Sequence, residues 1–422
     1  MVLSAVAQSN YSCASASNPF PKAHPGNRVR FFLFYTYLSY TQSVRTALAL
    51  FLSVSLGAVL SLSAQTGTPA PTESFAALSA KANAARDADR LDEAAALYKR
   101  ALALRPRWAE GWWSLATINY DRNSFAEASR AFLKVVQLSP KNGTAYVMLG
   151  LSEFELGQDD AALKHIQQGT NLAFDQTSDL RQVVLYHLGV IQQRQAKFEA
   201  AQETLNQLCL QDVKSEAVVS TMGMVLLRMS NKTAPTPGSE DANIVSRVGL
   251  AGCLAGQHKY DEARKLMAEV VTQYPKYPAI HYASGMVLVA ASDLPAARAE
   301  FAEEIKNNPA DVVCRLRIAA AFYKVNSAAG VPYAEEAVKL APQIPLGRYL
   351  LGLLYLDTEN YQKAIPELET ARKWMPKEPK LFFALGSAYS RTGRKQDAAQ
   401  ARATYERLTK ESAEAAASAS RP

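Results

Sequence analysis

The chain has 422 residues, of which 48% are hydrophobic and 20% charged, so it is globular in composition and has ample material for a core. Glycine and proline number 20 each, which excludes collagen-like and low-complexity chains. The net charge is +7, but residues 1–64 hold four basic and no acidic residues, and the rest of the chain has no basic stripe interleaved with aromatics, so nucleic acid is not an expected partner.

The first predicted element is an export signal. Residues 44–64 combine Arg45 with the apolar stretch Ala47–Leu62 and are interpreted as a signal peptide or a membrane anchor, although 16 apolar residues are short for a membrane span. Residues 1–43 are interpreted as a disordered extension or a wrongly assigned start, and residues 65–74 as a spacer. The chain is therefore expected to be exported, periplasmic or envelope-associated. The alternative is anchoring in the inner membrane by 44–64.

From residue 75 the sequence repeats with a period close to 34 residues. Similar segments end at prolines 106 and 140, and again at prolines 275, 309, 342 and 376. Each period has one apolar-periodic segment with a small residue at its centre, as Gly352 in "YLLGLLY", and a second with alanine, as Ala364 in "NYQKAIPELETARKWMP". Small residues let two helices cross closely, and proline ends the second helix. One such hairpin cannot bury its own apolar face, so neighbouring hairpins must stack.

This pattern resembles the tetratricopeptide repeat family. The resemblance implies an all-α fold, a right-handed superhelical solenoid of antiparallel helix pairs with about nine full repeats plus one partial repeat. The unit at 312–344 departs from the pattern, because Gly330 lies near the place where alanine is expected, and residues 413–422 are expected to be a disordered tail. The full units are predicted at 75–108, 109–142, 143–176, 182–215, 244–277, 278–311, 312–344, 345–378 and 379–412.

One stretch, "NKTAPTPGSED" at residues 231–241, breaks the period. A tenth unit starts near Glu216 with Gly223 in the first-helix position, but Pro235 stands where its second helix should carry alanine. The stretch therefore replaces a lost second helix. It is predicted to divide an N-terminal subarray, 75–230, from a C-terminal subarray, 242–412. A mobile hinge and a rigid connection that keeps one continuous superhelix both remain open.

The sequence holds no enzyme motif: no glycine-rich phosphate loop, GxSxG or HExxH is present. The five histidines show no metal-ligand spacing, so neither a metal nor a cofactor is expected, and the chain is not expected to be an enzyme. Cys209, Cys253 and Cys314 lie within helical apolar patterns. They are predicted to be buried apolar side chains rather than members of a disulfide framework.

The resemblance implies a concave groove, lined by the first helices, that binds a segment of a protein partner. Aromatic and arginine side chains are favoured at binding hot spots, but packing between adjacent repeats is the alternative for each aromatic. In this family a clamp for acidic chaperone tails uses lysine at inward-facing positions of the first helices. The fifth residue of the repeat unit, which is one of these positions, is not lysine here, so an apolar or extended peptide is the expected ligand instead. The expected groove residues are Trp113, Tyr120, Phe154, Tyr186, Arg194, Tyr282, Tyr349, Leu353, Phe383 and Arg391.

The sequence thus predicts a non-enzymatic protein–protein interaction scaffold of the cell envelope. The alternative is a substrate-presenting or regulatory module for an envelope enzyme carried on another chain, and a weaker one is an enzyme with an unrecognised site. Membrane contact is expected only through an uncleaved N-terminal segment. The oligomeric state is not predicted.

Overall fold

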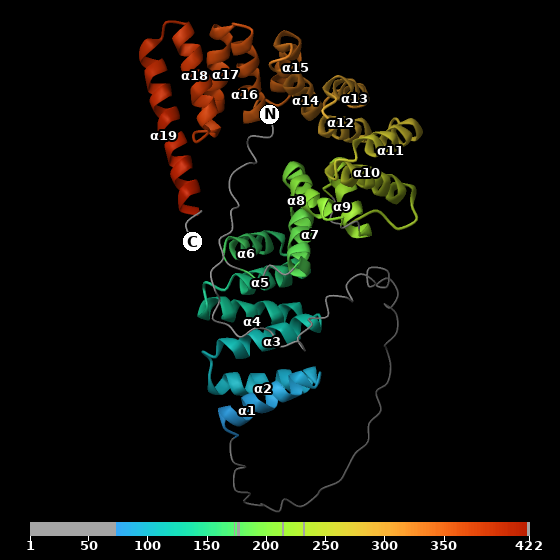
Figure 1. Ribbon diagram of the computed structural model, residues 1–422, viewed down its shortest axis with the longest axis vertical. Helices are drawn as coiled ribbons and strands as arrows, with labels where there is room; N and C mark the ends of the chain where they lie inside the picture. Colours follow the sequence, from blue (N-terminus) through green and yellow to red (C-terminus); the bar gives the residue numbers. More distant parts are fainter. Residues whose placement is uncertain (1–72, 173, 175–177, 213–214, 231–232, 420–422) are drawn as a thin grey trace, which may run out of the picture. The chain divides into compact units, whose positions relative to one another are not determined.

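The structure is a computed structural model that describes residues 73–172, 174, 178–212, 215–230 and 233–419 (Figure 1). The predicted extension at 1–43, the signal at 44–64 and all but the last two residues of the spacer lie outside the described residues. The described chain forms two compact units. The N-terminal unit ends at His187 and the C-terminal unit begins at Leu188, so the division falls within one helix, α7 (Ser178–Arg194).

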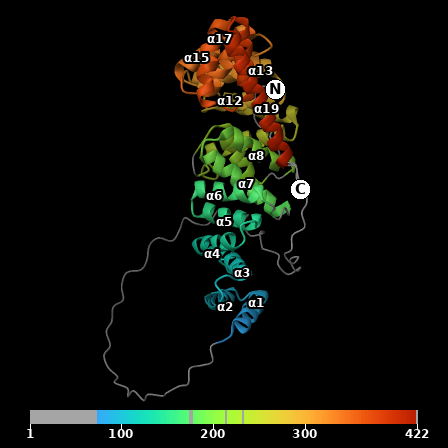
Figure 2. The ribbon, with the colours of Figure 1, turned by 90° about the vertical axis from the view of Figure 1, so that its left-hand side faces the viewer.

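Every regular element in the described residues is an α-helix, as the repeat pattern predicts. In the N-terminal unit the helices follow one another in pairs, and both views show them stacked in chain order (Figures 1 and 2). They are α1 (Phe75–Asp87), α2 (Leu91–Leu104), α3 (Ala109–Asp121), α4 (Phe125–Leu138), α5 (Gly143–Glu155), α6 (Asp159–Asn171) and the first part of α7.

The C-terminal unit continues the same alternation after α7. Each helix packs against the next one along the chain, which is the arrangement of a solenoid. The helices are α8 (Phe198–Leu210), α9 (Glu216–Leu226), α10 (Glu240–Gly256), α11 (Tyr260–Gln273), α12 (Ile280–Ala290), α13 (Leu294–Asn307), α14 (Val312–Phe322), α15 (Ser327–Leu340), α16 (Pro345–Asp357), α17 (Tyr361–Trp374), α18 (Pro379–Arg391) and α19 (Lys395–Ala419).

The helix crossings are as close as the small residues predict. A Cβ atom placed on Gly150 would lie 2.7 Å from Ile166 Cγ1, and one on Gly352 would lie 2.6 Å from Leu368 Cδ2. Real Cβ atoms do not approach other atoms so closely, because packing at that distance is repulsive. The glycines therefore set the spacing between the two helices of a pair.

The interrupted unit has no second helix in its described residues, which agrees with the predicted loss at Pro235. Instead, α9 packs directly on α10, the first helix of the next pair. A Cβ on Gly223 would lie 1.9 Å from the carbonyl oxygen of Val245, and one on Gly249 would lie 1.8 Å from that of Val219. The two backbones therefore touch, and α10 serves as partner to both α9 and α11.

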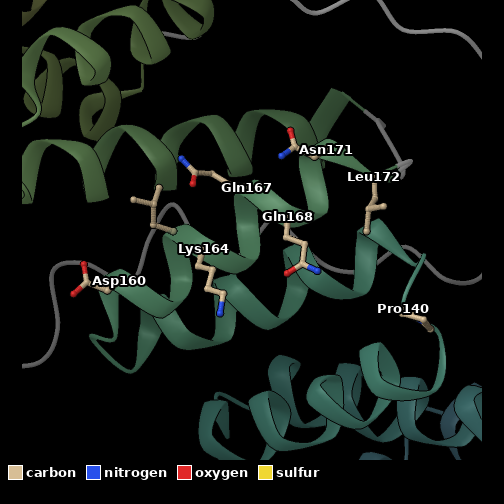
Figure 3. A pocket seen from close by; sticks show the side chains of 8 residues that line it. Pro140, Asp160, Lys164, Gln167, Gln168, Asn171 and Leu172 are labelled. Carbon is tan, nitrogen blue, oxygen red and sulfur yellow. The ribbon is translucent and has the colours of Figure 1, made fainter. Parts of the chain in front are cut away.

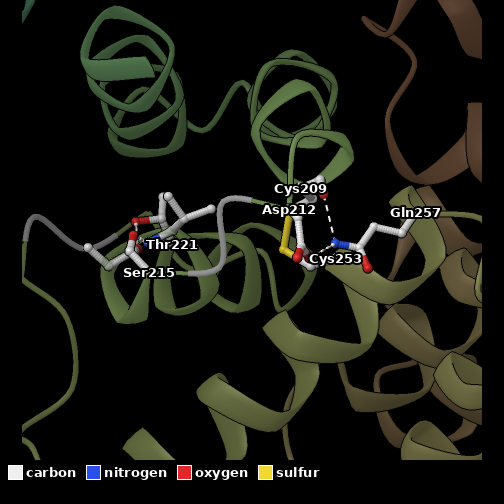
Figure 4. Close-up of a disulfide and its surroundings, with 8 residues drawn as sticks. Cys209, Asp212, Ser215, Thr221, Cys253 and Gln257 are labelled. Carbon is white, nitrogen blue, oxygen red and sulfur yellow. Dashed lines mark hydrogen bonds between the residues drawn. A yellow bond between two sulfur atoms is a disulfide. The ribbon is translucent and has the colours of Figure 1, made fainter. Parts of the chain in front are cut away.

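The prediction for two of the cysteines is wrong. Cys209 at the end of α8 and Cys253 in α10 form a disulfide, with their Cα atoms 5.1 Å apart and a sequence separation of 44 residues (Figure 4). The apolar periodicity reports only that each side chain is buried; it does not report that the lost helix lets α8 pack against α10. Cys314 is a free, buried thiol, as predicted, and burial raises the pKa of this thiol.

The C-terminal end differs from the predicted disordered tail, because α19 continues to Ala419. Alanine has the highest helix propensity, and Arg407 lies 2.7 Å from Glu411 in an i,i+4 ion pair that supports the helix. Among the described helices, none combines the length and apolar character that a bilayer crossing requires.

Candidate partner-binding surface

The predicted groove residues of the N-terminal unit are packed to different degrees. Trp113 is half-buried, with its ring 5.5 Å from that of Phe132, whereas Tyr120 on the same helix is only 8% exposed. Phe154 and Tyr186 are half-buried, and the structure brings both against one residue that was not predicted, His187, at ring distances of 4.6 and 5.3 Å. The accessible part of this surface therefore belongs to Trp113, Phe154 and Tyr186.

In the C-terminal unit, three predicted groove residues lie within the packing between helices. Tyr282 is 3% exposed, Tyr349 8% and Leu353 7%. Large side chains at this depth make most of their contacts with neighbouring helices, so removing them would disturb the fold as well as any binding surface. The structure thus favours a packing role for these three in the free protein.

The two predicted residues of the last repeat are exposed. Phe383 occupies the position of Tyr349 one repeat later, yet 60% of its surface is accessible. Tyr349 is covered because another pair follows it, whereas no helix pair follows α18 and α19 in the described chain. Arg391 is also exposed, and its guanidinium lies 5.9 Å from the centre of the Tyr361 ring. Arg194, the remaining predicted residue, is half-buried on α7.

An ionic cluster that the sequence did not reveal gathers four helices of the C-terminal unit. Arg228 Nη1, just after α9, lies 3.2 Å from Glu199 Oε1 of α8 and donates a 3.2 Å hydrogen bond to the hydroxyl of Tyr282 on α12. Arg317 of α14 lies 3.3 Å from the same Glu199 oxygen. Burial alone would raise the pKa of Glu199, but the charges of Arg228 and Arg317 outweigh it and hold that pKa below its usual value. The members of this ionic cluster are up to 118 residues apart in sequence, which is too far for a sequence motif to connect them.

A pocket of about 250 Å³ opens beside the disulfide. Three small residues of α10, namely Gly252, Ala255 and Gly256, are part of its lining. The volume is below the roughly 300–1,000 Å³ of small-molecule sites and suits a single large apolar side chain. The other lining residues are Gln202, Asn206, Leu210, Leu226, His258, Tyr260, Met286, Val287 and Ala290.

The N-terminal unit has a larger hollow, about 500 Å³, along the outside of α6 (Figure 3). Its walls are mainly polar side chains of this one helix, including Asp160, Lys164 and Gln168, with Pro140 at one edge. Neither this hollow nor the pocket beside the disulfide is lined by any of the predicted groove residues. The pocket beside the disulfide is the better candidate, because several helices enclose it and its floor is apolar.

No group of three or more histidine, cysteine, aspartate or glutamate side chains within the described residues is arranged to hold a metal ion. The chemistry that the surface offers is that of recognition: aromatic faces, a side-chain-sized pocket and paired charges.

The stacked helix pairs define an all-α repeat protein of the solenoid type. The tetratricopeptide repeat profile matches residues 79–143, 120–170, 254–312, 319–373 and 349–413, and a second profile of the same description matches 183–215. These matches cover more than half of the chain, so it belongs to the tetratricopeptide repeat family. They leave out the interrupted unit, where the second helix is missing.

Solved structures of the same repeat type are similar to parts of this chain. A MamA fragment from Desulfovibrio magneticus RS-1 shares 24% identity, with a TM-score of 0.36, over 39% of this chain and 96% of that one. A tetratricopeptide repeat protein from Parabacteroides merdae shares 16%, with a TM-score of 0.30, over 66% and 98%. The APC/C Cut9–Hcn1 complex shares 13%, with a TM-score of 0.33, over 79% and 87%. No curated protein matches the chain.

Proposed function

We propose that this protein is an exported, non-enzymatic scaffold of the cell envelope that binds an extended segment of a protein partner. Membership in the tetratricopeptide repeat family carries the proposal, because stacked repeats create extended surfaces for binding other proteins. The segment contacts mainly first-helix positions, and by binding its partner this protein helps to assemble an envelope complex.

The disulfide supports export. Disulfides persist in secreted and periplasmic proteins and are rare in the reducing cytosol. Cys209 and Cys253 are both fully buried, so the bond sits inside the fold rather than at a reactive surface position. The basic and apolar residues of 44–64 give a second, independent reason to place the chain outside the cytosol.

The pocket beside the disulfide supports an apolar anchor in the partner segment. Met286 and Val287 form part of the apolar lining of the pocket. The side-chain amides of Gln202 and Asn206 also line it, and amides of this kind can hydrogen-bond the backbone of an extended peptide. Phe383, exposed at the last repeat, offers a second aromatic contact.

The test is capture of a partner by three proteins. Ala290→Phe fills the pocket, and Ala328→Phe adds the same ring at an exposed alanine of α15 that lies outside it. Envelope extract is passed over wild type and both variants, each checked for an unchanged melting temperature. We expect one envelope protein to bind wild type and Ala328→Phe and to be lost with Ala290→Phe. Retention of every captured protein by Ala290→Phe would contradict binding at this pocket.

Export has its own measurement. The tagged chain is expressed in its native host, the cells are fractionated, and each fraction is denatured in the presence of an alkylating reagent so that buried free thiols also react. We expect the protein in the envelope fraction with Cys209 and Cys253 protected from the reagent. A cytosolic protein with both thiols modified would overturn this part of the proposal.

A further inference from the structure

The helix α8 is tied at both of its ends to elements that lie beyond α9, the single helix of the interrupted repeat. At its C-terminal end Cys209 is bonded to Cys253 of α10. The amide of Gln257 adds hydrogen bonds of 2.8 Å to the carbonyl of Cys209 and 3.0 Å to Asp212 (Figure 4). These contacts bypass α9 entirely.

At the other end of α8 the tie is ionic. Glu199, in the first turn, accepts hydrogen bonds from Arg228 beyond α9 and from Arg317 of α14. The arginine side chains are 24% and 13% exposed, whereas that of Glu199 is 56% exposed. An ion pair with one partner in water is weak and sensitive to salt.

The two ties stand where the fold lacks a helix. In a complete repeat a second helix would lie between α9 and α10, but here α9 and α10 pack backbone to backbone at Gly223 and Gly249. The helices after α9 are therefore held to α8 by α9, which packs on both α8 and α10, by the direct α8–α10 contact and by these two ties.

We propose that the disulfide and the Glu199 ion pairs are two locks on the interrupted repeat, and that reduction leaves a junction which opens locally with salt. The Cys209–Cys253 disulfide forms by thiol–disulfide exchange. The disulfide of an oxidoreductase or of oxidised glutathione accepts the two electrons and two protons that the two thiols lose, and it is thereby reduced to two thiols. The cellular timing, locking after export, rests on the proposed function; the two-lock behaviour does not.

Cys314, the third cysteine of the residues that the structure describes, does not compete in this exchange. Cys314 is fully buried, and burial raises the pKa of its thiol, so the reactive thiolate is scarce. Cys314 therefore supplies a matched control for the loss of a buried sulfur that takes no part in the disulfide.

Hydrogen exchange of the purified full chain tests both locks. Four proteins are compared: wild type, Glu199→Gln, Cys209→Ala/Cys253→Ala and Cys314→Ala. Each is measured with and without dithiothreitol, in about 50 mM and about 500 mM sodium chloride, which bracket strong and weak screening. Peptides from α9 and α10 report the junction, and peptides from α16 and α17 report the rest of the unit.

In the oxidised wild type we expect protection of α9 and α10 that does not change with salt. Dithiothreitol should lower it by about 30-fold to 1,000-fold, the range that typical disulfides imply, and high salt should lower it further. Reduced Glu199→Gln should be open at low salt already, and the double cysteine variant should match the reduced wild type without reductant. Cys314→Ala should respond to dithiothreitol as wild type does.

Two results would overturn the proposal. One is unchanged protection of α9 and α10 on reduction. The other is an equal loss in α16 and α17, which would mean that the bond stabilises the whole unit rather than the junction. These measurements need no partner, so their failure is distinct from a failure of partner capture.

Discussion

The backbone contact between α9 and α10 can be tested by adding one methyl group at Gly249. A Cβ there would lie 1.8 Å from the carbonyl oxygen of Val219 and 2.8 Å from the amide nitrogen of Gly223. Ordinary contact needs more than about 3 Å, so the helices must separate by more than 1 Å, and the obstructing atoms are backbone atoms that cannot rotate away. Overpacking of this kind costs about 3 kcal/mol, offset by about 1 kcal/mol of helix propensity gained over glycine. We therefore expect Gly249→Ala to lower the free energy of unfolding by about 2 kcal/mol.

Gly347 in α16 is the matched control. A Cβ at this glycine would meet Leu316 Cδ2 at 3.5 Å and Val338 Cγ2 at 3.7 Å, which are ordinary contacts. Gly347→Ala should then raise the free energy of unfolding by about 0.5–1 kcal/mol. Urea unfolding of the oxidised full chain gives the two values, and hydrogen exchange assigns the Gly249→Ala loss to α9 and α10. A Gly249→Ala protein at least as stable as wild type would refute the close crossing.

Two further predictions concern side chains of the C-terminal unit. Tyr349→Ala should cost about 3–5 kcal/mol of unfolding free energy, whereas Phe383→Ala, at 60% exposure, should cost less than about 1 kcal/mol; equal losses in urea unfolding would contradict the burial difference. Burial raises the pKa of Glu304, although its carboxylate accepts backbone hydrogen bonds from Ala279 and Tyr282 at 3.2 and 3.3 Å. A raised acid pKa contributes stability below the unfolded value, near 4.5, and this stability is lost as pH rises through the folded value. Glu304→Gln should therefore remove a decline in unfolding free energy that begins near pH 4.5, and parallel pH profiles of the two proteins would count against it.

The fold could be predicted because its information is local and repeated. The 34-residue spacing, the small residue at each crossing and the proline after most second helices all act within one hairpin. The tight turns show the limit of residue-type reasoning. Gly157 and Gly393 adopt the left-handed conformation, which suits glycine, but in the unit at 345–378 it is Glu359, not the neighbouring Asn360, that does so. The tight turn between the two helices requires one residue in the left-handed conformation, and Glu359 adopts it although glutamate has no preference for that region.

The binding surface could be predicted only in part, because a first-helix position does not determine how much of a side chain the next repeat covers. Tyr349 and Phe383 occupy equivalent positions, and one is buried while the other is exposed. The cluster of Glu199, Arg228 and Arg317 escaped prediction for another reason. Its members join only when several repeats have stacked. Arg228, which lies 34 residues after Arg194, holds the position of that predicted groove residue in the interrupted unit, but no sequence signal pairs it with Glu199.

The interruption at 231–241 shows both what a local sequence pattern predicts and what depends on contacts between repeats. The prolines predict correctly that a helix is missing, yet they say nothing of what closes the gap. Removing a helix from a stacked array exposes the apolar faces of its neighbours, and the chain can bury them only by bringing those neighbours together. Glycines at 223 and 249 permit that approach, and the Cys209–Cys253 bond holds the next helix to the one before. The three features are therefore one adaptation, in which small residues remove the obstacle and a covalent tie replaces packing that the missing helix would have supplied. If so, restoring a second helix by insertion should make the disulfide dispensable for stability.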